Sequence, residues 1–228
     1  MHTVPGIKVL YFGTPVVLIT TRNADGSANI APMSSAWWLN GNAVLGLGNA
    51  AQTAANIVRE GECVLNLPSS DLVGPVDRLA MTTGRRNVPG YKAEMGYRFV
   101  RDKFGLAGFT EQASELVCPP RILECPIQME CRLTAAHPIG RAGGLTAFEV
   151  EVLRTHVEER LVIPGTHYID PQAWDPLIMK FCEFFGGGRP VHASRLAAGW
   201  EMPHRLGTSA PPEEPEGSEP VLSGSASA

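Results

Sequence analysis

The sequence predicts a fold made mainly of antiparallel β-strands, with short helices packed outside the sheet. Two turn signals support this class: Asp25-Gly26 follows the β-branched run 15–21, and Asn40-Gly41 precedes the apolar run 42–47. Both dipeptides favour the left-handed backbone that tight hairpins require. In addition, Phe148 and Val150 alternate with acidic residues within 145–157, which is typical of a strand with one buried face.

The other elements follow in order from local patterns. The run 27–39 reads as a strand that ends at Asn40-Gly41, and a short helix is predicted over 53–59. An apolar strand follows over 63–68, and then a helix over 70–84 whose Pro75 suits the first turn. Residues 84–120 are punctuated by Gly and Pro and predict a long, partly ordered excursion. Strands over 122–137 and 145–157 predict a final long hairpin.

Composition divides the chain into a folded domain over 1–205 and a tail over 206–228. The tail is rich in Pro, Glu, Ser, Gly and Ala and has no aromatic residue. Such a segment buries too little apolar area to offset the entropy of ordering it, so disorder is predicted there.

Bulk properties exclude several classes of function. The net charge of −4 shows no basic surplus, so nucleic-acid binding is not expected. No apolar run reaches the roughly 20 residues that span a bilayer, and the N-terminus lacks the pattern of a signal peptide, so a cytoplasmic protein is expected. Five cysteines without a CxxC pair predict reduced thiols, mostly buried in the core. The six histidines have no HxxxH or HxH spacing, so no metal site is predicted.

The stretch 43–57 first suggests a dinucleotide-binding loop, because an apolar strand runs into Gly46-x-Gly48-x-x-Ala51 and a helix follows. However, no acidic residue ends the next strand, and tight hairpins are incompatible with parallel neighbours. The helix N-terminus can still bind an anion through its free N–H groups. Gln52, Thr53 and Asn56 would then cap the helix or face the anion.

At this point the chain resembles the flavin reductase-like family. The resemblance covers about 9–187 and rests on the order and spacing of Asn29-Ile-Ala31-Pro32-Met-Ser34-Ser35 and Ala51-Gln52-Thr53-Ala-Ala-Asn56, with similar segments at 63–69, 102–110, 124–131 and 149–157. It implies an FMN-binding split antiparallel β-barrel and assigns cofactor contacts to Asn29, Met33, Ser34, Ser35, Ala36, Trp37, Gly48, Gln52, Thr53, Asn56, Lys103 and Phe185.

One position departs from the family pattern, since the family often has lysine where this chain has Ala51. The positive charge beside the phosphate must then come from elsewhere. Lys103, in a segment that resembles the family's, is the leading replacement, and Arg85 and Arg86 are the alternatives.

The resemblance also places His156 near the flavin, where an imidazole would stabilise reduced flavin or orient the second substrate. Trp37 and Trp38 face opposite ways in an extended chain, so one is expected to contact ligand or a partner subunit while the other packs. Phe184 and Phe185, before three glycines, would cover the ring or pack in the core.

The function implied is hydride transfer from NADH or NADPH to FMN in a homodimer that supplies reduced flavin to a monooxygenase. Two alternatives remain open: an FMN-dependent oxidase or oxygenase with an organic substrate, and a non-catalytic flavin-binding protein. No triad or G-x-S-x-G elbow favours a hydrolase.

Overall fold

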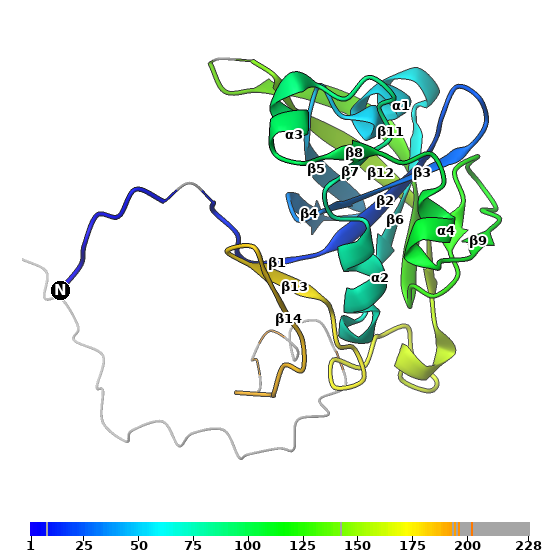
Figure 1. Cartoon of the computed structure of the whole chain (residues 1–228). Helices are drawn as coiled ribbons and strands as arrows, with labels where there is room; N and C mark the ends of the chain where they lie inside the picture. Colours follow the sequence, from blue (N-terminus) through cyan, green and yellow to red (C-terminus); the bar gives the residue numbers. More distant parts are fainter. Residues whose placement is uncertain (8, 142, 193, 195, 197–201, 203–228) are drawn as a thin grey trace, which may run out of the picture. The chain divides into compact units, whose positions relative to one another are not determined.

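The computed structural model describes residues 1–7, 9–141, 143–192, 194, 196 and 202 (Figure 1). The chain divides into two units, Met1–Gly188 and Arg189–Ala228. The elements described below all belong to the first unit. The predicted tail over 206–228 lies outside the described residues, so the boundary at 205 stays a prediction.

The first unit is built on a seven-stranded antiparallel sheet with the order β3-β2-β6-β11-β12-β5-β4. This sheet confirms the expectation of a mainly β fold. Its strands are β2 (Val17–Arg22), β3 (Ala28–Met33), β4 (Ala36–Leu39), β5 (Asn42–Gly48), β6 (Glu62–Leu67), β11 (Ile127–Ile139) and β12 (Leu145–Val157).

The two edge strands of this sheet, β3 and β4, are neighbours in sequence. Ser34 and Ser35 alone separate them, so the Cα atoms of Met33 and Ala36 lie at most about 11 Å apart. The sheet must therefore curl until its edges approach, yet within the described residues no ladder pairs β3 with β4. This is the geometry of a split barrel. The single strand expected over 27–39 is instead two strands, broken at the point where the chain crosses between the edges.

The predicted hairpins are present. The Asp25-Gly26 turn joins antiparallel β2 and β3, and the Asn40-Gly41 turn joins β4 and β5. Asn40 and Gly41 have φ of 47° and 77°, as a two-residue turn with left-handed backbone requires. Since β5 is antiparallel to both of its neighbours, the dinucleotide-loop reading of 43–57 is excluded.

The core explains why the run 16–19, before the first hairpin, is apolar at every position. Val17 and Ile19 pack in one buried cluster with Leu45, Ile57 and Phe148. Leu18, on the opposite face of β2, packs in a second cluster that includes Ile30 and Leu79. Because β2 is covered on both faces, it reads as a continuous hydrophobic run and not as an alternating one.

Short elements surround the sheet. The helices are α1 (Gln52–Glu60), η1 (Ser70–Leu72), α2 (Val73–Arg78), α3 (Gly90–Glu94), α4 (Lys103–Ala107) and η2 (Glu159–Leu161). The small sheets are formed by β1 (Phe12–Pro15), β13 (Ile178–Lys180) and β14 (Glu183–Phe185), by β7 (Thr82–Thr83) and β8 (Arg98–Phe99), and by β9 (Glu111–Gln112) and β10 (Arg121–Ile122).

Two local predictions need correction: the end of the second helix and the burial of two cysteines. The helix expected over 70–84 ends at Arg78, and Met81 adopts a left-handed φ of 55° that no helix continues through. The excursion over 84–120 contains α3, β8, α4 and β9. Cys118 and Cys182 are exposed, whereas the other three cysteines are buried as expected.

Among the described residues, no helix is both long and apolar enough to cross a membrane.

Candidate functional site

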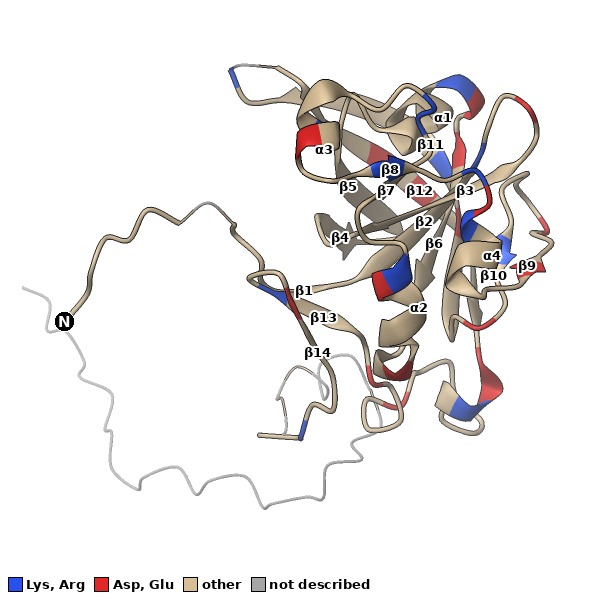
Figure 2. Cartoon of the chain, viewed as in Figure 1, with Lys and Arg blue, Asp and Glu red and all other residues tan. Residues whose placement is uncertain are grey.

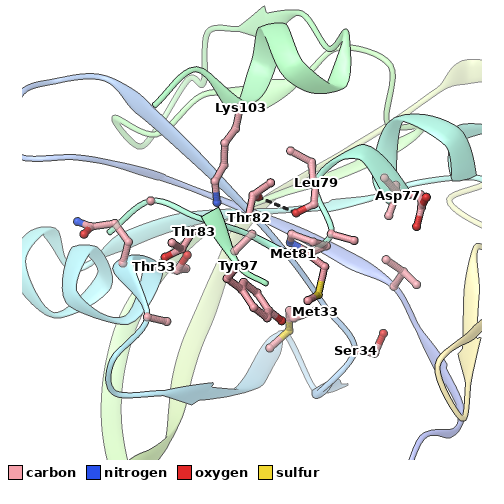
Figure 3. A pocket seen from close by; sticks show the side chains of 18 of the residues that line it. Met33, Ser34, Thr53, Asp77, Leu79, Met81, Thr82, Thr83, Tyr97 and Lys103 are labelled. Atoms are coloured by element: carbon pink, nitrogen blue, oxygen red, sulfur yellow. Dashed lines mark hydrogen bonds between the residues drawn. The ribbon is translucent and has the colours of Figure 1, made fainter. Parts of the chain in front are cut away.

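A cavity of about 510 Å³ lies beside β3 and the first turn of α1. Its walls also include residues that follow α2, residues of β7 and α3, and the first residue of α4. Figure 3 shows Thr53, Tyr97 and Lys103 around this space, with Asp77 well away from Thr53. The volume falls within the range of about 300–1,000 Å³ that small-molecule sites occupy.

The first turn of α1 is open to a ligand. Ala51 is the N-cap and supplies no side-chain hydrogen bond, so no side chain in the described part of the chain satisfies the N–H groups of the first turn. The prediction that Thr53 caps the helix is wrong, because its hydroxyl accepts a hydrogen bond from Asn29 Nδ2 at 3.0 Å instead. Uncapped N–H groups and the helix dipole together favour an anion at this end.

Asn29 on β3 adds an acceptor without a partner. Its side chain is 2% exposed, and among the described groups its Oδ1 has no hydrogen-bond partner. The backbone of Gly84 packs so closely that a Cβ there would lie 2.5 Å from this oxygen. Buried acceptors are normally satisfied, so the Asn29 Oδ1 indicates a donor that a bound ligand would supply.

Lys103 brings a buried cation to the same cavity. Asp102 caps α4 by accepting from the Gly105 N–H at 2.7 Å, and this cap fixes the start of the short helix that carries Lys103. The side chain is 3% exposed, and its Nζ donates to the Ile30 carbonyl at 2.7 Å. Burial, with a smaller contribution from Lys92, lowers the pKa of Lys103 to about 8. Among the described residues, Lys103 forms no ion pair.

The fold gathers half of the residues assigned by the family resemblance into this cavity. They come from three separate parts of the chain, on β3 or directly after it, at the start of α1 and at the start of α4. They are Asn29, Met33, Ser34, Gln52, Thr53 and Lys103.

Four of the assigned residues lie elsewhere. Asn56 is fully buried and bonds to Thr21, Asn23, Gln52 and Arg59, which leaves it no free group for a ligand. Ala36 belongs to the core. The Ser35 carbonyl accepts from Gly46 and the Gly48 carbonyl accepts from Ala51, so these backbones shape the sheet edge and the turn before α1.

The aromatic assignments are also changed by the structure. Trp37 is 55% exposed on the edge strand β4 and does not line the cavity, while Trp38 packs against the core. This matches the expectation that the two rings face opposite ways. Phe185 lies outside the cavity with Lys180 over its ring, because alternation along β14 turns the preceding Phe184 inward in its place.

His156 lies on β12 and is not part of the cavity lining. Its Nε2 is 2.7 Å from Glu130 Oε1, and Glu130 is fully buried. Burial alone raises the pKa of this carboxyl, but hydrogen bonds from the Glu115 and Leu116 N–H groups and from His156 outweigh it, so the pKa lies below its usual range. Within one chain, His156 contacts the Glu130 carboxylate and does not line the cavity. The catalytic role of His156 stays a prediction.

Several cavity residues were not identified from the sequence. Tyr11, Lys92, Tyr97 and the loop 82–84 line the cavity, yet they come from segments without a clear periodic pattern. One signal was available: Gly84 stands before two arginines, and a glycine there permits close approach of a backbone to a site.

A flavin reductase-like domain model matches residues 9–173. The chain belongs to the flavin reductase-like family. One relative is the uncharacterized protein YdfE of Bacillus subtilis, which is 38% identical over 184 residues, covering 81% of this chain and 88% of that protein.

Solved structures similar to this family member share its fold. Flavoredoxin of Desulfovibrio vulgaris has a TM-score of 0.70 at 24% identity, covering 87% of this chain and 100% of that one. Nitrilotriacetate monooxygenase component B from Bacillus cereus has a TM-score of 0.65 at 22% identity, covering 82% and 89%. Pseudomonas fluorescens 2-nitrobenzoate 2-nitroreductase has a TM-score of 0.65 at 18% identity, covering 86% and 88%.

Proposed function

We propose that this protein binds FMN in the cavity beside α1 and transfers hydride from NADH or NADPH to N5 of the flavin. The observation that carries the proposal is the combination, in one cavity, of uncapped N–H groups, an unsatisfied acceptor on Asn29 and the buried cation of Lys103. A phosphate ester suits the first and third of these groups, and a sugar-like hydroxyl suits the second.

The residues present fit FMN. Bound FMN would supply the electron-accepting ring that hydride chemistry requires. The first turn of α1 would hold the phosphate, and Asn29 would accept from the ribityl chain. Met33, Tyr97 and Phe184 would cover the apolar ring and exclude water, while Lys103 would hold a positive charge in the same space. No general acid is needed in this scheme, since hydride transfer depends mainly on close stacking.

The test is an absorbance titration. FMN added to the purified protein should shift its absorbance spectrum, and anaerobic NADH or NADPH should bleach the visible absorbance of the bound flavin. Retention of flavin through dialysis would separate a resident cofactor from a diffusible substrate. Failure of both nucleotides to reduce protein-bound FMN would favour a non-catalytic flavin-binding protein.

The fate of the reduced flavin is part of the proposal. Two similar structures are named as component B of nitrilotriacetate monooxygenase, which supports a partner oxygenase that receives reduced flavin from this protein in the cytoplasm. The alternative is an FMN-dependent oxidase or oxygenase acting on an organic substrate. The wall made by Met81 and Tyr97 favours it, because an apolar wall would enclose such a substrate beside the ring.

We also propose a homodimer whose interface includes β4. Trp37 and Leu39 are 55% and 68% exposed on this edge strand, and large apolar side chains on a free edge favour association. Light scattering should report twice the 24.5 kDa chain mass. Trp37→Glu should shift the mass toward that of one chain, whereas a wild-type protein of 24.5 kDa at micromolar concentration would contradict the dimer.

A further inference from the structure

The loop after β7 lies directly against the N-terminus of α1. The Arg85 N–H donates to Thr83 Oγ1 at 3.1 Å, and the Arg85 Nε donates to the Ala50 carbonyl at 3.2 Å. Ala50 is the residue before the Ala51 N-cap, so these bonds hold the half-buried guanidinium beside the open end of the helix. Gly84, in the same loop, forms part of the cavity wall.

A second cation accompanies Arg85. Lys92 on α3 lines the cavity and is half-buried with its Nζ over the Tyr97 ring. Burial, followed by repulsion from Arg85, lowers the pKa of Lys92. Among the described residues, neither Arg85 nor Lys92 forms an ion pair with a carboxylate. The fold thus keeps two like charges together, at a cost that an anion between them would remove.

The local sequence around Arg85 and Lys92 also has more basic than acidic side chains. Residues 84–99 contain four basic side chains and one acidic one, although the whole chain carries a net charge of −4. Figure 2 shows part of this basic segment on β8, near α3 and α1. The segment that contributes Gly84 and Lys92 to the cavity lining is therefore basic in a protein that is negative overall.

We propose that Arg85, with Lys92, neutralises the phosphate of FMN at the first turn of α1, in the place of a cation that Ala51 does not supply. This inference rests on the proposed function. Two features point to the same place: the uncapped nine-residue helix, and the two cations that have no carboxylate partner among the described residues. The buried, unsatisfied Asn29 Oδ1 lines the same cavity and would accept from a hydroxyl of the same ligand. Lys103 donates one hydrogen bond to the Ile30 carbonyl on β3 and keeps two further donors, so it adds a third positive charge to the same cavity.

The test compares FMN with riboflavin, which differ only in the phosphate. Arg85→Gln should weaken FMN binding by roughly ten- to a hundredfold, since it removes a charge-assisted contact, and should leave riboflavin affinity within about twofold. Lys92→Gln should act in the same direction. Fluorescence quenching measures both affinities without any turnover.

Two further variants make the comparison specific. Arg86→Gln removes the neighbouring exposed guanidinium, which lies over the Phe99 ring at 5.4 Å, and it should leave the FMN-to-riboflavin ratio unchanged. Neither arginine is part of the cavity lining, but Arg85 bonds to the Ala50 carbonyl beside α1. Ala51→Lys in the Arg85→Gln background should restore much of the lost FMN affinity, because it places a cation at the same helix end. Melting temperatures identify any variant that fails to fold, and Arg85→Lys then serves as the second variant, with partial retention expected.

The outcomes are distinct. Wild-type protein that binds neither flavin would overturn the proposed function itself. Equal affinity for FMN and riboflavin would keep flavin binding and overturn the phosphate subsite. An unchanged ratio in folded Arg85→Gln and Lys92→Gln proteins would also overturn it. A change only in preference between NADPH and NADH would assign the two cations to the nicotinamide nucleotide and not to FMN.

Discussion

Replacing Lys103 by Met is expected to weaken FMN binding by roughly ten- to a hundredfold while raising the melting temperature by a few degrees. The affinity falls because the cavity loses a buried positive charge that faces a dianion. Stability rises because the ammonium is 3% exposed and has no carboxylate partner among the described residues. A pKa lowered from 10.5 to about 8 corresponds to a burial cost of about 3 kcal/mol. The lost hydrogen bond to Ile30 offsets about half of that gain.

The same lysine gives FMN binding a pH dependence of known sign. The pKa of Lys103 lies below its ordinary value, so between about pH 8 and 10.5 the unfolded chain holds a proton that the folded chain lacks. Stability therefore rises with pH through this window and is insensitive to this group below it. A bound anion favours the charged amine, so FMN affinity should fall as the pH rises above about 8.

Calorimetric titrations from about pH 7 to 9.5, a range that brackets the Lys103 pKa of about 8, would measure the dependence, and Lys103→Met should remove it. The other titratable groups of the cavity wall remain in the variant; they are Tyr11, Asp77, Lys92, Tyr97 and Cys182. Lys180→Met is the matched control, because that lysine lies outside the cavity over Phe185. A Lys103→Met protein with wild-type FMN affinity at every pH would contradict the assignment.

Replacing Glu130 by Gln is expected to destabilise the protein by about 3 kcal/mol, with FMN affinity within twofold of wild type. The fully buried carboxylate accepts hydrogen bonds from the Glu115 and Leu116 N–H groups and contacts His156 at 2.7 Å. An amide has one acceptor oxygen fewer, so buried donors would lose their partner. Urea unfolding monitored by tryptophan fluorescence measures the change.

The pH dependence of this effect separates charge from packing. The pKa of Glu130 is lowered in the fold, so its contribution is present above the unfolded value of about 4.3 and is lost as the pH falls toward the folded value. The gap between wild type and Glu130→Gln should therefore close in acid. Glu149→Gln is the matched control, since its pair with His137 is exposed and should contribute less than about 1 kcal/mol. A similar loss in both variants would be inconsistent with the special role of the buried pair.

If Glu130→Gln does lower FMN affinity strongly, the expectation that His156 acts near the flavin gains support. The substitution reaches His156 through the direct contact between the two side chains. An affinity within twofold would instead agree with the placement of His156 outside the cavity lining.

The sequence by itself determined the antiparallel class, the two tight turns and the helix over α1, and it predicted an anion at the N-terminal end of that helix. These features are encoded over a few neighbouring residues: Asn40-Gly41 specifies a turn locally, and glycines before Gln52 specify a strand-to-helix junction. The segments at 29–35 and 51–56 also predicted the family, because their order and spacing can be recognised without knowing which residues they contact.

Only the tertiary structure decided which residues meet. Trp37 and Phe185 share local patterns with Trp38 and Phe184, but which ring faces the cavity depends on the register of each strand against neighbours far away in sequence. Lys103 and Ile30 are 73 positions apart, and Arg85 and Ala50 are 35 apart, so no local pattern could reveal either contact. Burial and charge pairing are properties of packed surfaces, and for that reason the positive side of the cavity became visible only in the fold.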